Sequence, residues 1–485
     1  MKELNFLVFM TDQQNGDTQP PYSKALMPNL ERLYRNGVAF SKAYCPAPHC
    51  CPSRATFFTG LYPTQHGVWN NVDLGGALSK GLYDNVRLFS EDFADAGYDM
   101  YFSGKWHVSA QEGPDNRGFH LVHHLQHQNK GYKIHPSVPD TGDWRWCNQN
   151  LSVDGTRPKR DGEIQREGYP EYIHYGEEEN PFRDQDVINA AKKTIEELDT
   201  ERPFFMYVGP LGPHDPYQVP QRYLDMYPIE DIELPKSFYD TMEDKPALYR
   251  RTRDRFAHLT EKEHKEAIRH YLAFCTYEDF LFGEVLDSLE KRGLLENTVV
   301  MYLSDHGDYM GAHGLWTKGL PCFQEAYHIC SVIGYGGIKT TEKTIEKFVS
   351  LSDYAPTLLE LAGIHADRSF AGKSLVPFLS GERCEEWREE LYTQSNGNEL
   401  YGIQRGVFDK EYKLVYNGFD YDEFYDLKRD PQEMHNLIHE EKYQAIIKQM
   451  YQKLWSFAFE NQDNIADPYI TTALATYGPD IIFKE

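Results

Sequence analysis

The chain of 485 residues has no hydrophobic segment long enough to cross a membrane. Its opening, MKELNFLVFMTDQQ, has six apolar residues, interrupted by Asn5, before the polar residues Thr11 and Asp12. A signal peptide needs an apolar core of about 7–15 residues, and a membrane helix needs about 20. We therefore expect a cytoplasmic protein with no membrane partner, or a periplasmic or secreted protein if a leader has been removed.

Cysteine and basic residues are both scarce. The eight cysteines show neither CxxC spacing nor the density of a disulfide framework, so we expect reduced thiols. Lysine and arginine together number 50 against 75 acidic residues, which gives a formal charge of -25. A surface this acidic repels nucleic acids and anionic lipids, so we expect neither as a partner. A local basic pocket for a small anion is still compatible with this composition.

Short apolar runs that end in polar residues recur along the chain, without any internal repeat. Their length and their aromatic and β-branched content are typical of buried strands. They lie at residues 5–10, 98–104, 203–210 and 298–303. Helical patterns lie between them, at residues 27–37, 89–98 and 277–295. This alternation predicts an α/β fold with a sheet between layers of helices, and ligands in such folds bind beyond the carboxyl ends of the strands.

The character of the sequence changes near residues 374–387. Short strand-like segments and a helical pattern around 441–458 follow. We therefore predict a large domain over residues 1–381 and a smaller antiparallel subdomain over residues 382–485. Residues 108–190 have weak periodicity and predict long loops or an insertion over the site.

The stretch HCCPSRATFFTG, residues 49–60, predicts a helix that begins at Pro52 and stops at Gly60. A side chain just before Pro52 would lie at the helix N-terminus, where backbone N–H groups favour an anion. Arg54 adds a planar, charged fork suited to tetrahedral oxyanions. On these grounds alone the segment is a generic anion site, and a cysteine there is more often a packed thiol than a nucleophile.

The pattern C-x-P-S-R-A-x-x-x-T-G resembles the signature of the type I sulfatases, which belong to the alkaline phosphatase superfamily. The match begins at Cys50, because Pro52 and Arg54 then fall at the second and fourth following positions; with Cys51 first they do not. The resemblance spans residues 5–437. It implies an alkaline phosphatase-like α/β fold, with a large mixed, mostly parallel sheet and a smaller C-terminal antiparallel α+β subdomain. It also implies a maturation enzyme that oxidises Cys50 to formylglycine (3-oxoalanine), whose hydrated aldehyde is the nucleophile.

The same resemblance implies a divalent metal site. TDQQ resembles the first metal-binding turn, with Asp12 and Gln13 as ligands, and SDHGD resembles the second, with Asp305 and His306. The matured Cys50 would complete the set. Its oxygen-rich chemistry favours Ca²⁺, whereas the imidazole also admits Mn²⁺ or another divalent transition metal.

Further family motifs imply catalytic residues around the sulfate group. GKWH supplies Lys105 and His107, as a sulfate-oxygen ligand and a partner of the formylglycine hydroxyls. GPHDPY supplies His214 and HGLWTKG supplies Lys318, which would contact the sulfate and the ester oxygen. We favour His214 as general acid because imidazole transfers protons at neutral pH. Asp305 is the family's usual general base.

Several polar residues outside these motifs have two interpretations. Asn70 is expected near the pocket, and Asp308 and His313 either support the site or cap a turn. The histidine run predicts a solvated loop rather than a metal site; it comprises His120, His123, His124 and His127.

Together these features predict a sulfuric ester hydrolase that acts on a small sulfate ester. The aromatic and charged stretch GDWRWCNQN, residues 142–150, would suit stacking on a sugar ring, so a carbohydrate sulfate is the expected substrate. A phosphonate monoester or phosphodiester hydrolase of the same superfamily is the alternative. Gln13 and His306 favour that alternative, and the GKWH motif favours sulfate. A protein that binds without turnover is the remaining alternative if Cys50 is not matured.

Overall fold

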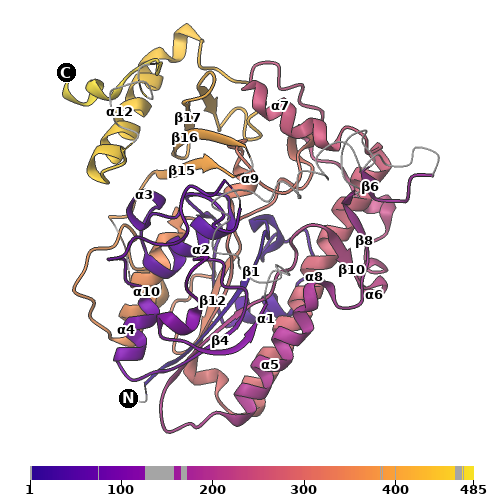
Figure 1. Cartoon of the computed structure of the whole chain (residues 1–485), viewed down its shortest axis with the longest axis vertical. Helices are drawn as coiled ribbons and strands as arrows, with labels where there is room; N and C mark the ends of the chain where they lie inside the picture. The colour runs from indigo at the N-terminus through magenta and orange to yellow at the C-terminus, as the bar shows by residue number, and fades with distance from the viewer. Residues whose placement is uncertain are drawn as a thin grey trace.

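An eight-stranded sheet forms the centre of the computed structural model (Figure 1), which describes residues 3–125, 158–164 and 172–484 apart from residues 75, 383, 385, 399, 465–471 and 473. In spatial order its strands are β13 (Thr344–Ile345), β2 (Gly37–Phe40), β12 (Ser331–Tyr335), β11 (Thr298–Ser304), β1 (Asn5–Thr11), β9 (Phe204–Gly209), β4 (Asp99–Gly104) and β5 (His120–His124). β12 runs antiparallel to both of its neighbours, and the other neighbouring pairs are parallel. The predicted large, mostly parallel sheet is confirmed.

β1 lies inside the sheet and is buried on both faces. Residues 6–10 have no exposed surface. Phe6, Val8 and Met10 contribute to one apolar core, whereas Leu7 and Phe9 contribute to another. A parallel strand covered on both faces is a continuous apolar run rather than an alternating one, and for this reason the sequence pattern identified it.

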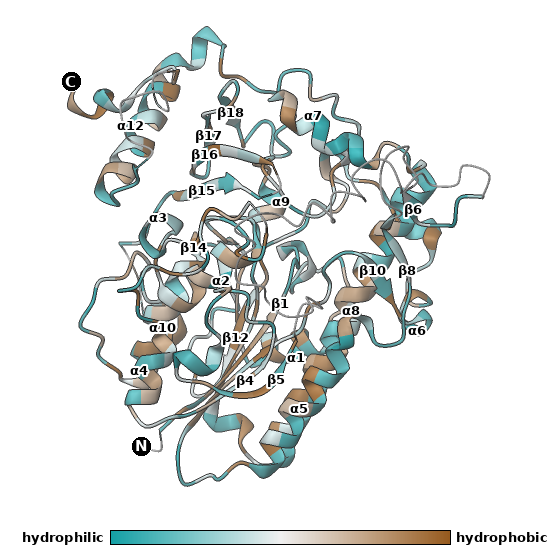
Figure 2. Cartoon of the chain, in the orientation of Figure 1, coloured by the Kyte–Doolittle hydropathy of each residue, from teal (hydrophilic) through white to brown (hydrophobic). Residues whose placement is uncertain are grey.

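Helices cover both faces of the sheet (Figure 1). The core that contains Phe6 is completed by α2 (Cys50–Thr59), α4 (Phe89–Asp95) and α10 (Tyr354–Ala362). The core that contains Leu7 is completed by α1 (Pro28–Arg35), α5 (Asp184–Glu197) and α8 (Glu261–Lys291). Figure 2 shows largely hydrophobic strands in the central sheet and helices of mixed hydropathy on either side. These helices bury apolar side chains against the sheet, and α2 is buried along its whole length.

Two predicted helices begin earlier than their sequence patterns indicated. The pattern at residues 277–295 matches only the later part of α8, which begins at Glu261 and is capped by the Thr260 side chain accepting the N–H of Glu263. The helix expected from Pro52 begins at Cys50 and ends at Gly60, whose φ of 71° is left-handed. Cys50 is thus inside the first turn rather than ahead of it.

A second sheet lies in the C-terminal part of the chain. Its antiparallel strands are β15 (Leu391–Gly397), β16 (Tyr401–Phe408), β17 (Tyr412–Asn417) and β18 (Glu423–Asp426). α12 (Gln444–Glu460) packs on it through an apolar core that includes Val407, Leu414 and Leu454. The predicted antiparallel subdomain is confirmed, and its boundary between residues 381 and 382 stays a prediction.

The histidine run is not a loop. His120, His123 and His124 lie in β5, which pairs in parallel with β4 as the last strand of the sheet in the described part of the chain. The expected loop is therefore wrong here, because pairing with β4 outweighed the polar composition. His127 and the stretch 142–150 lie outside the described residues.

The remaining elements are short. They include the strand pairs β3 (Ala43–Tyr44) with β14 (Val349–Ser350), β8 (Tyr175–Glu177) with β10 (Tyr217–Val219), and β6 (Glu163–Ile164) with β7 (Tyr172–Ile173), and the helices α3 (Pro63–His66), α6 (Gln221–Leu224), α7 (Ala247–Arg253), α9 (Gln324–Tyr327) and α11 (Val376–Ser380). Among the described residues, no helix combines the length and the apolar composition that a membrane crossing requires.

His66 makes the stability of this fold depend on pH. The ring is buried; Val68 N–H donates to Nδ1 at 3.1 Å, and Nε2 lies 3.1 Å from Thr56 Oγ1. Burial lowers the pKa of His66 to about 3. Because the unfolded chain binds this proton near pH 6.5, the stabilisation is present above that pH and is lost as the pH falls towards 3. His66→Asn should therefore reduce the loss of unfolding free energy between pH 7.5 and 5 by about 2 kcal/mol.

Urea unfolding at a series of pH values measures this difference. The matched control is His365→Asn, because solvent reaches the exposed His365 ring in the folded chain as well. Parallel pH profiles for wild type and His66→Asn would contradict the prediction.

Candidate active site

The candidate site lies at the carboxyl ends of β1 and β11. These strands pair in parallel with Thr11 opposite Ser304, so the following residues, Asp12 and Asp305, leave the sheet side by side. The N–H of Asp305 donates to the carbonyl oxygen of Thr11 at 3.2 Å and extends the pairing to this point. Two carboxylates from distant parts of the sequence are therefore neighbours where α/β folds bind ligands.

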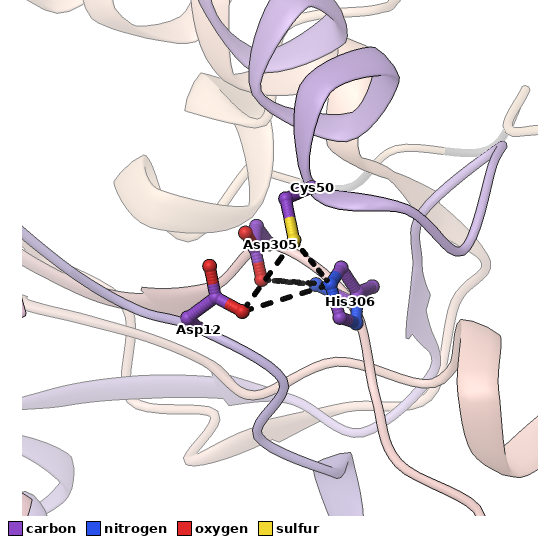
Figure 3. A group of neighbouring side chains, drawn as sticks. All are labelled: Asp12, Cys50, Asp305 and His306. Atoms are coloured by element: carbon purple, nitrogen blue, oxygen red, sulfur yellow. Dashed lines mark hydrogen bonds and ion pairs between the residues drawn. The ribbon is translucent and has the colours of Figure 1, made fainter. Parts of the chain in front are cut away.

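Cys50, at the start of α2, directs its thiol at these carboxylates (Figure 3). Its Sγ lies 3.6 Å from Asp12 Oδ1 and 3.3 Å from His306 Nε2. Nδ1–H of His306 donates to the carbonyl oxygen of Gly307 at 2.9 Å, which leaves Nε2 facing the cluster. One ligand atom from each of Asp12, Cys50, Asp305 and His306 lies within 4.8 Å of the others, and all four residues are buried.

Arg54 is fully buried and bridges the two carboxylates. Its Nε donates to Asp305 Oδ2 at 2.8 Å, and Nη2 donates to Asp12 Oδ2 at 3.0 Å. Nη1 donates to the carbonyl oxygen of Lys105 at 3.1 Å and to the Tyr207 hydroxyl at 2.9 Å. Each guanidinium nitrogen thus has a protein partner. Arg54 orients the carboxylates rather than presenting its whole fork to an oxyanion, as the sequence had suggested.

Lys105 and His107 follow the end of β4. Lys105 Nζ forms a buried ion pair with Asp12 Oδ2 at 2.6 Å. His107 has a φ of 52°, a left-handed conformation that non-glycine residues rarely adopt. Its Nε2 lies 3.2 Å from Asp73 Oδ1, and the ring lies close to the side chains of Cys50 and Cys51. Both predicted residues therefore reach the Cys50 cluster.

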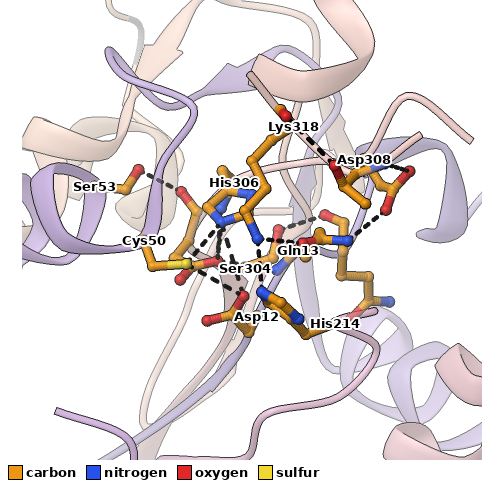
Figure 4. A network of polar contacts seen from close by, with 12 residues as sticks. Asp12, Gln13, Cys50, Ser53, His214, Ser304, His306, Asp308 and Lys318 are labelled. Carbon is orange, nitrogen blue, oxygen red and sulfur yellow. Dashed lines mark hydrogen bonds and ion pairs between the residues drawn. The ribbon is translucent and has the colours of Figure 1, made fainter. Parts of the chain in front are cut away.

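Gln13 connects the cluster to a second group of side chains (Figure 4). Lys318 Nζ donates to Gln13 Oε1 at 2.5 Å, and Gln13 Nε2 donates to Asp308 Oδ2 at 2.6 Å. Lys318 Nζ also lies 2.6 Å from His214 Nε2. The structure thus brings His214 and Lys318 together as a pair. The amide oxygen of Gln13 is engaged by Lys318, and its function as a metal ligand stays a prediction.

The contacts of His214 define its tautomer. Nδ1–H donates to the carbonyl oxygen of Asp215 at 2.6 Å, so Nε2 is left to accept from the Lys318 ammonium group. The Asp215 carboxylate accepts from Gln13 Nε2 at 3.3 Å and from the Tyr172 hydroxyl. His214 is therefore held by its neighbours with Nε2 and Lys318 Nζ in contact.

The site concentrates negative charge between fixed cations. Burial raises the pKa of Asp12, but Lys105 and Arg54 help to outweigh this effect and hold it well below its usual range. Burial, followed by repulsion from Asp12, raises the pKa of Asp305. Burial raises the pKa of the Cys50 thiol too, but nearby cations, Lys105 first, lower it well below its ordinary value. Asp12 therefore stays ionised inside the protein.

The donor set fits a divalent cation. Asp12 and Asp305 offer carboxylate oxygens, and His306 offers Nε2 because its other ring nitrogen is held by a carbonyl group, an arrangement typical of metal-binding histidines. Two buried carboxylates in proximity repel each other, and a cation between them removes that repulsion. A ligand set of carboxylate oxygens with a single imidazole nitrogen suits Ca²⁺ or Mn²⁺.

Asp308, His313 and Asn70, whose positions the sequence left open, make different contacts. Asp308 supports the site: its carboxylate accepts from Gln13 Nε2 and, at 2.6 Å, from the Tyr217 hydroxyl, and burial raises its pKa to about 6. His313 Nδ1 lies 2.7 Å from Asp240 Oδ2. Asn70 Oδ1 accepts the N–H of Leu78 at 2.9 Å. Asp308 thus holds Gln13, whereas Asn70 shapes a loop.

Sequence reasoning missed several residues that contact the site. Tyr207 lies within the apolar run of β9, where nothing distinguishes it from a core tyrosine. Asp73 and Tyr172 belong to no motif. Asp215 directly follows His214 in GPHDPY, and this adjacency was the one signal available.

Comparisons with known proteins place the chain in one family. The model of the family described as "Sulfatase" matches residues 5–364, and one described as "N-sulphoglucosamine sulphohydrolase, C-terminal" matches residues 311–460. An arylsulfatase of Clostridium perfringens is 28% identical over 91% of this chain and 92% of its own. An N-acetylglucosamine-6-O-sulfatase of Bacteroides thetaiotaomicron is 24% identical over 96% of this chain and 88% of its own.

A solved structure shares the fold. The phosphonate monoester hydrolase of Agrobacterium radiobacter superposes with a TM-score of 0.77 at 21% identity, covering 94% of this chain and 96% of that chain. This likeness confirms the alkaline phosphatase-like architecture that the sequence predicted.

Loss of Arg54 should destabilise the protein strongly. Arg54→Ala leaves two buried carboxylates without their shared guanidinium, and breaking a buried ion pair costs about 3–5 kcal/mol of unfolding free energy. Arg35→Ala is the matched control. It removes an exposed pair with Glu31 and should cost less than about 0.5 kcal/mol. Urea unfolding of both variants checks the prediction, which equal losses would contradict.

Proposed function

The chain belongs to the sulfatase family and hydrolyses sulfuric esters, and we propose that it releases sulfate from a small sulfated carbohydrate by means of a formylglycine made from Cys50 and a divalent cation. The observation that carries this proposal is the position of Cys50. Its side chain lies at the start of a helix, within one buried cluster with Asp12, Asp305 and His306.

Asp12, Asp305, His306 and the residue at position 50 would hold the cation, with Gln13 at the edge of the set. A bound cation would supply Lewis-acid stabilisation of charge on a sulfate oxygen, and the hydrated aldehyde would supply a hydroxyl nucleophile. The fixed positions of the carboxylates on Arg54 prepare this site before any ligand arrives.

Lys105 and His107 would orient the sulfate group and the nucleophile. Lys105 brings a positive charge into the buried cluster. Burial lowers the pKa of its ammonium group, but Asp12 and Cys50 raise that pKa by more, so the group stays charged. His107 lies beside the side chain at position 50, and its Nε2 contacts Asp73 Oδ1. These contacts place a cation and a proton donor or acceptor beside the reacting atoms.

His214 and Lys318 would act on the leaving group as a pair. The imidazole Nε2 accepts from the Lys318 ammonium group at 2.6 Å, so the mobile proton lies between these two nitrogens. We assign the role of general acid to this pair. The pair would deliver the proton to the ester oxygen from its own solvent-exposed side. The His214 side chain is 21% exposed, which gives it access to a leaving alcohol.

The cleft beside His214 is evidence for a polar leaving group that carries hydroxyl groups. Its volume is about 940 Å³, within the range of cavities that hold drug-sized ligands. Hydrogen-bonding side chains in its lining include His124, Glu178, Asn180 and Gln218. The names of the N-acetylglucosamine-6-O-sulfatase relative and of the matching C-terminal family model support the carbohydrate substrate.

Sulfate release from a panel of esters tests the proposal. Matured enzyme should hydrolyse a sulfated mono- or disaccharide with the highest kcat/KM, ahead of an aryl sulfate and a phosphonate monoester. Cys50→Ala should lower kcat by at least about 10³-fold, since it removes the nucleophile. Mass spectrometry of the Cys50 peptide should show the lower mass of formylglycine.

Cys45→Ser is the control for the nucleophile, because this thiol is buried as well and its Sγ lies 3.9 Å from the carbonyl oxygen of Ala326. It should keep the wild-type kcat. A preference for the phosphonate would favour the alternative hydrolase, and a preference for aryl sulfate alone would refute the carbohydrate substrate.

Removal of the cation should lower both activity and thermal stability. A ligand that binds only the folded state stabilises it, so chelator-treated protein should melt at a lower temperature than the metal-loaded form. Calorimetric scans and sulfate release before and after addition of Ca²⁺ or Mn²⁺ measure both effects, and the ion that restores both identifies the preferred metal. Full activity in metal-free protein would contradict the site.

A further inference from the structure

A second cluster of metal-ligating side chains adjoins the first. One ligand atom from each of Cys51, Asp73 and His107 lies within 4.8 Å of the others. Cys51 has no exposed surface, the His107 side chain is 4% exposed, and the Asp73 side chain is 17% exposed. The cluster is therefore largely buried, and Asp73 is its most exposed member.

The thiol of Cys51 is held in place by the backbone. Cys51 is the second residue of α2, and its Sγ accepts the N–H of Val72 at 3.4 Å. An N–H group aimed at the sulfur stabilises a thiolate and fixes its direction, as the outer partners of metal ligands do. Val72 also precedes Asp73, so one short segment supports the thiol and supplies the carboxylate.

The loop that carries Asp73 is itself braced. Asn71 N–H donates to Asn398 Oδ1 at 2.9 Å, and Lys80 Nζ donates to the carbonyl oxygens of Val72 and Leu74, both at 3.3 Å. On the other side, the left-handed backbone of His107 directs its ring at Asp73. Residues held in such backbone conformations cluster at functional sites.

We propose that Cys51, Asp73 and His107 form a binding site for a thiophilic divalent cation of the zinc class. Thiolate, imidazole and carboxylate are the three ligand types that zinc takes, and three protein ligands leave a fourth position for water or another oxygen. Because the Cys51 sulfur is a soft ligand, this site prefers a different class of metal ion from the oxygen-rich cluster at Asp12. Binding replaces the thiol proton of Cys51, which is released to solvent, and no electron is transferred.

Occupation of this site inhibits the enzyme. A cation on His107 occupies the imidazole that lies beside the side chain at position 50 and withdraws it from that side chain. This consequence rests on the proposed function of His107, whereas binding itself does not. Zinc-class ions therefore act as inhibitors, and hard ions such as Ca²⁺ do not.

Cobalt absorption tests the binding. Matured, full-length, Ca²⁺-loaded protein has no thiol at position 50, so a thiolate-to-cobalt charge-transfer band on addition of Co²⁺ should come from Cys51. Cys51→Ser should abolish the band, and Cys45→Ser, the matched buried thiol, should keep it. Asp73→Asn should weaken Co²⁺ binding by at least about tenfold. A band that survives in Cys51→Ser, or the lack of a band in wild type, would overturn the site.

Zinc inhibition tests the consequence. The Zn²⁺ concentration for half-inhibition of sulfate release should rise at least about tenfold in Cys51→Ser, with the Ca²⁺-loaded enzyme as reference. An unchanged value would overturn the inhibition. A protein that binds Co²⁺ through Cys51 but shows no sulfatase activity would overturn the proposed function and leave the site standing.

Discussion

The ion pairs between one buried guanidinium and two carboxylates are the constraint on which this site depends. Asp12 and Asp305 come from adjacent parallel strands, and their mutual repulsion inside the protein has to be offset. Arg54 supplies a planar fork with nitrogens spaced to reach both, at 3.0 and 2.8 Å. Because Arg54 lies one helical turn after Cys50, the same contacts set the position of α2 and hence of Cys50.

The two adjacent cysteines serve separate clusters for a simple geometric reason. Successive side chains on a helix point about 100° apart, since a turn contains 3.6 residues. Cys50 therefore faces Asp12 and His306, whereas Cys51 faces Val72 and the side of His107. His107 lies close to both cysteines and belongs to the group that contains Cys51.

The C-terminal sheet braces the segments that surround the site. Gln394 in β15 donates its N–H to the carbonyl oxygen of Pro46 at 2.7 Å and accepts the N–H of Thr64 at 3.1 Å, so it braces the chain before and after α2. Asn398 holds the loop that leads to Asp73. The smaller sheet is thus a support for the first turn of α2 and for its neighbours.

The sequence alone determined the strands, the order of the motifs and the position of Cys50 at the start of a helix. The apolar runs of β1, β4, β9 and β11 alternate with helical segments, and this alternation is a local pattern. The Cys50 signature, with several residues at fixed spacing, is a local pattern as well. Local patterns do not encode which distant side chains meet. The bridging contacts of Arg54, the pairing of His214 with Lys318, and the roles of Tyr207 and Asp73 depend on strand register and loop bracing. These were decided only by the tertiary structure, because a contact between residues far apart in the chain exists only after the sheet has aligned them.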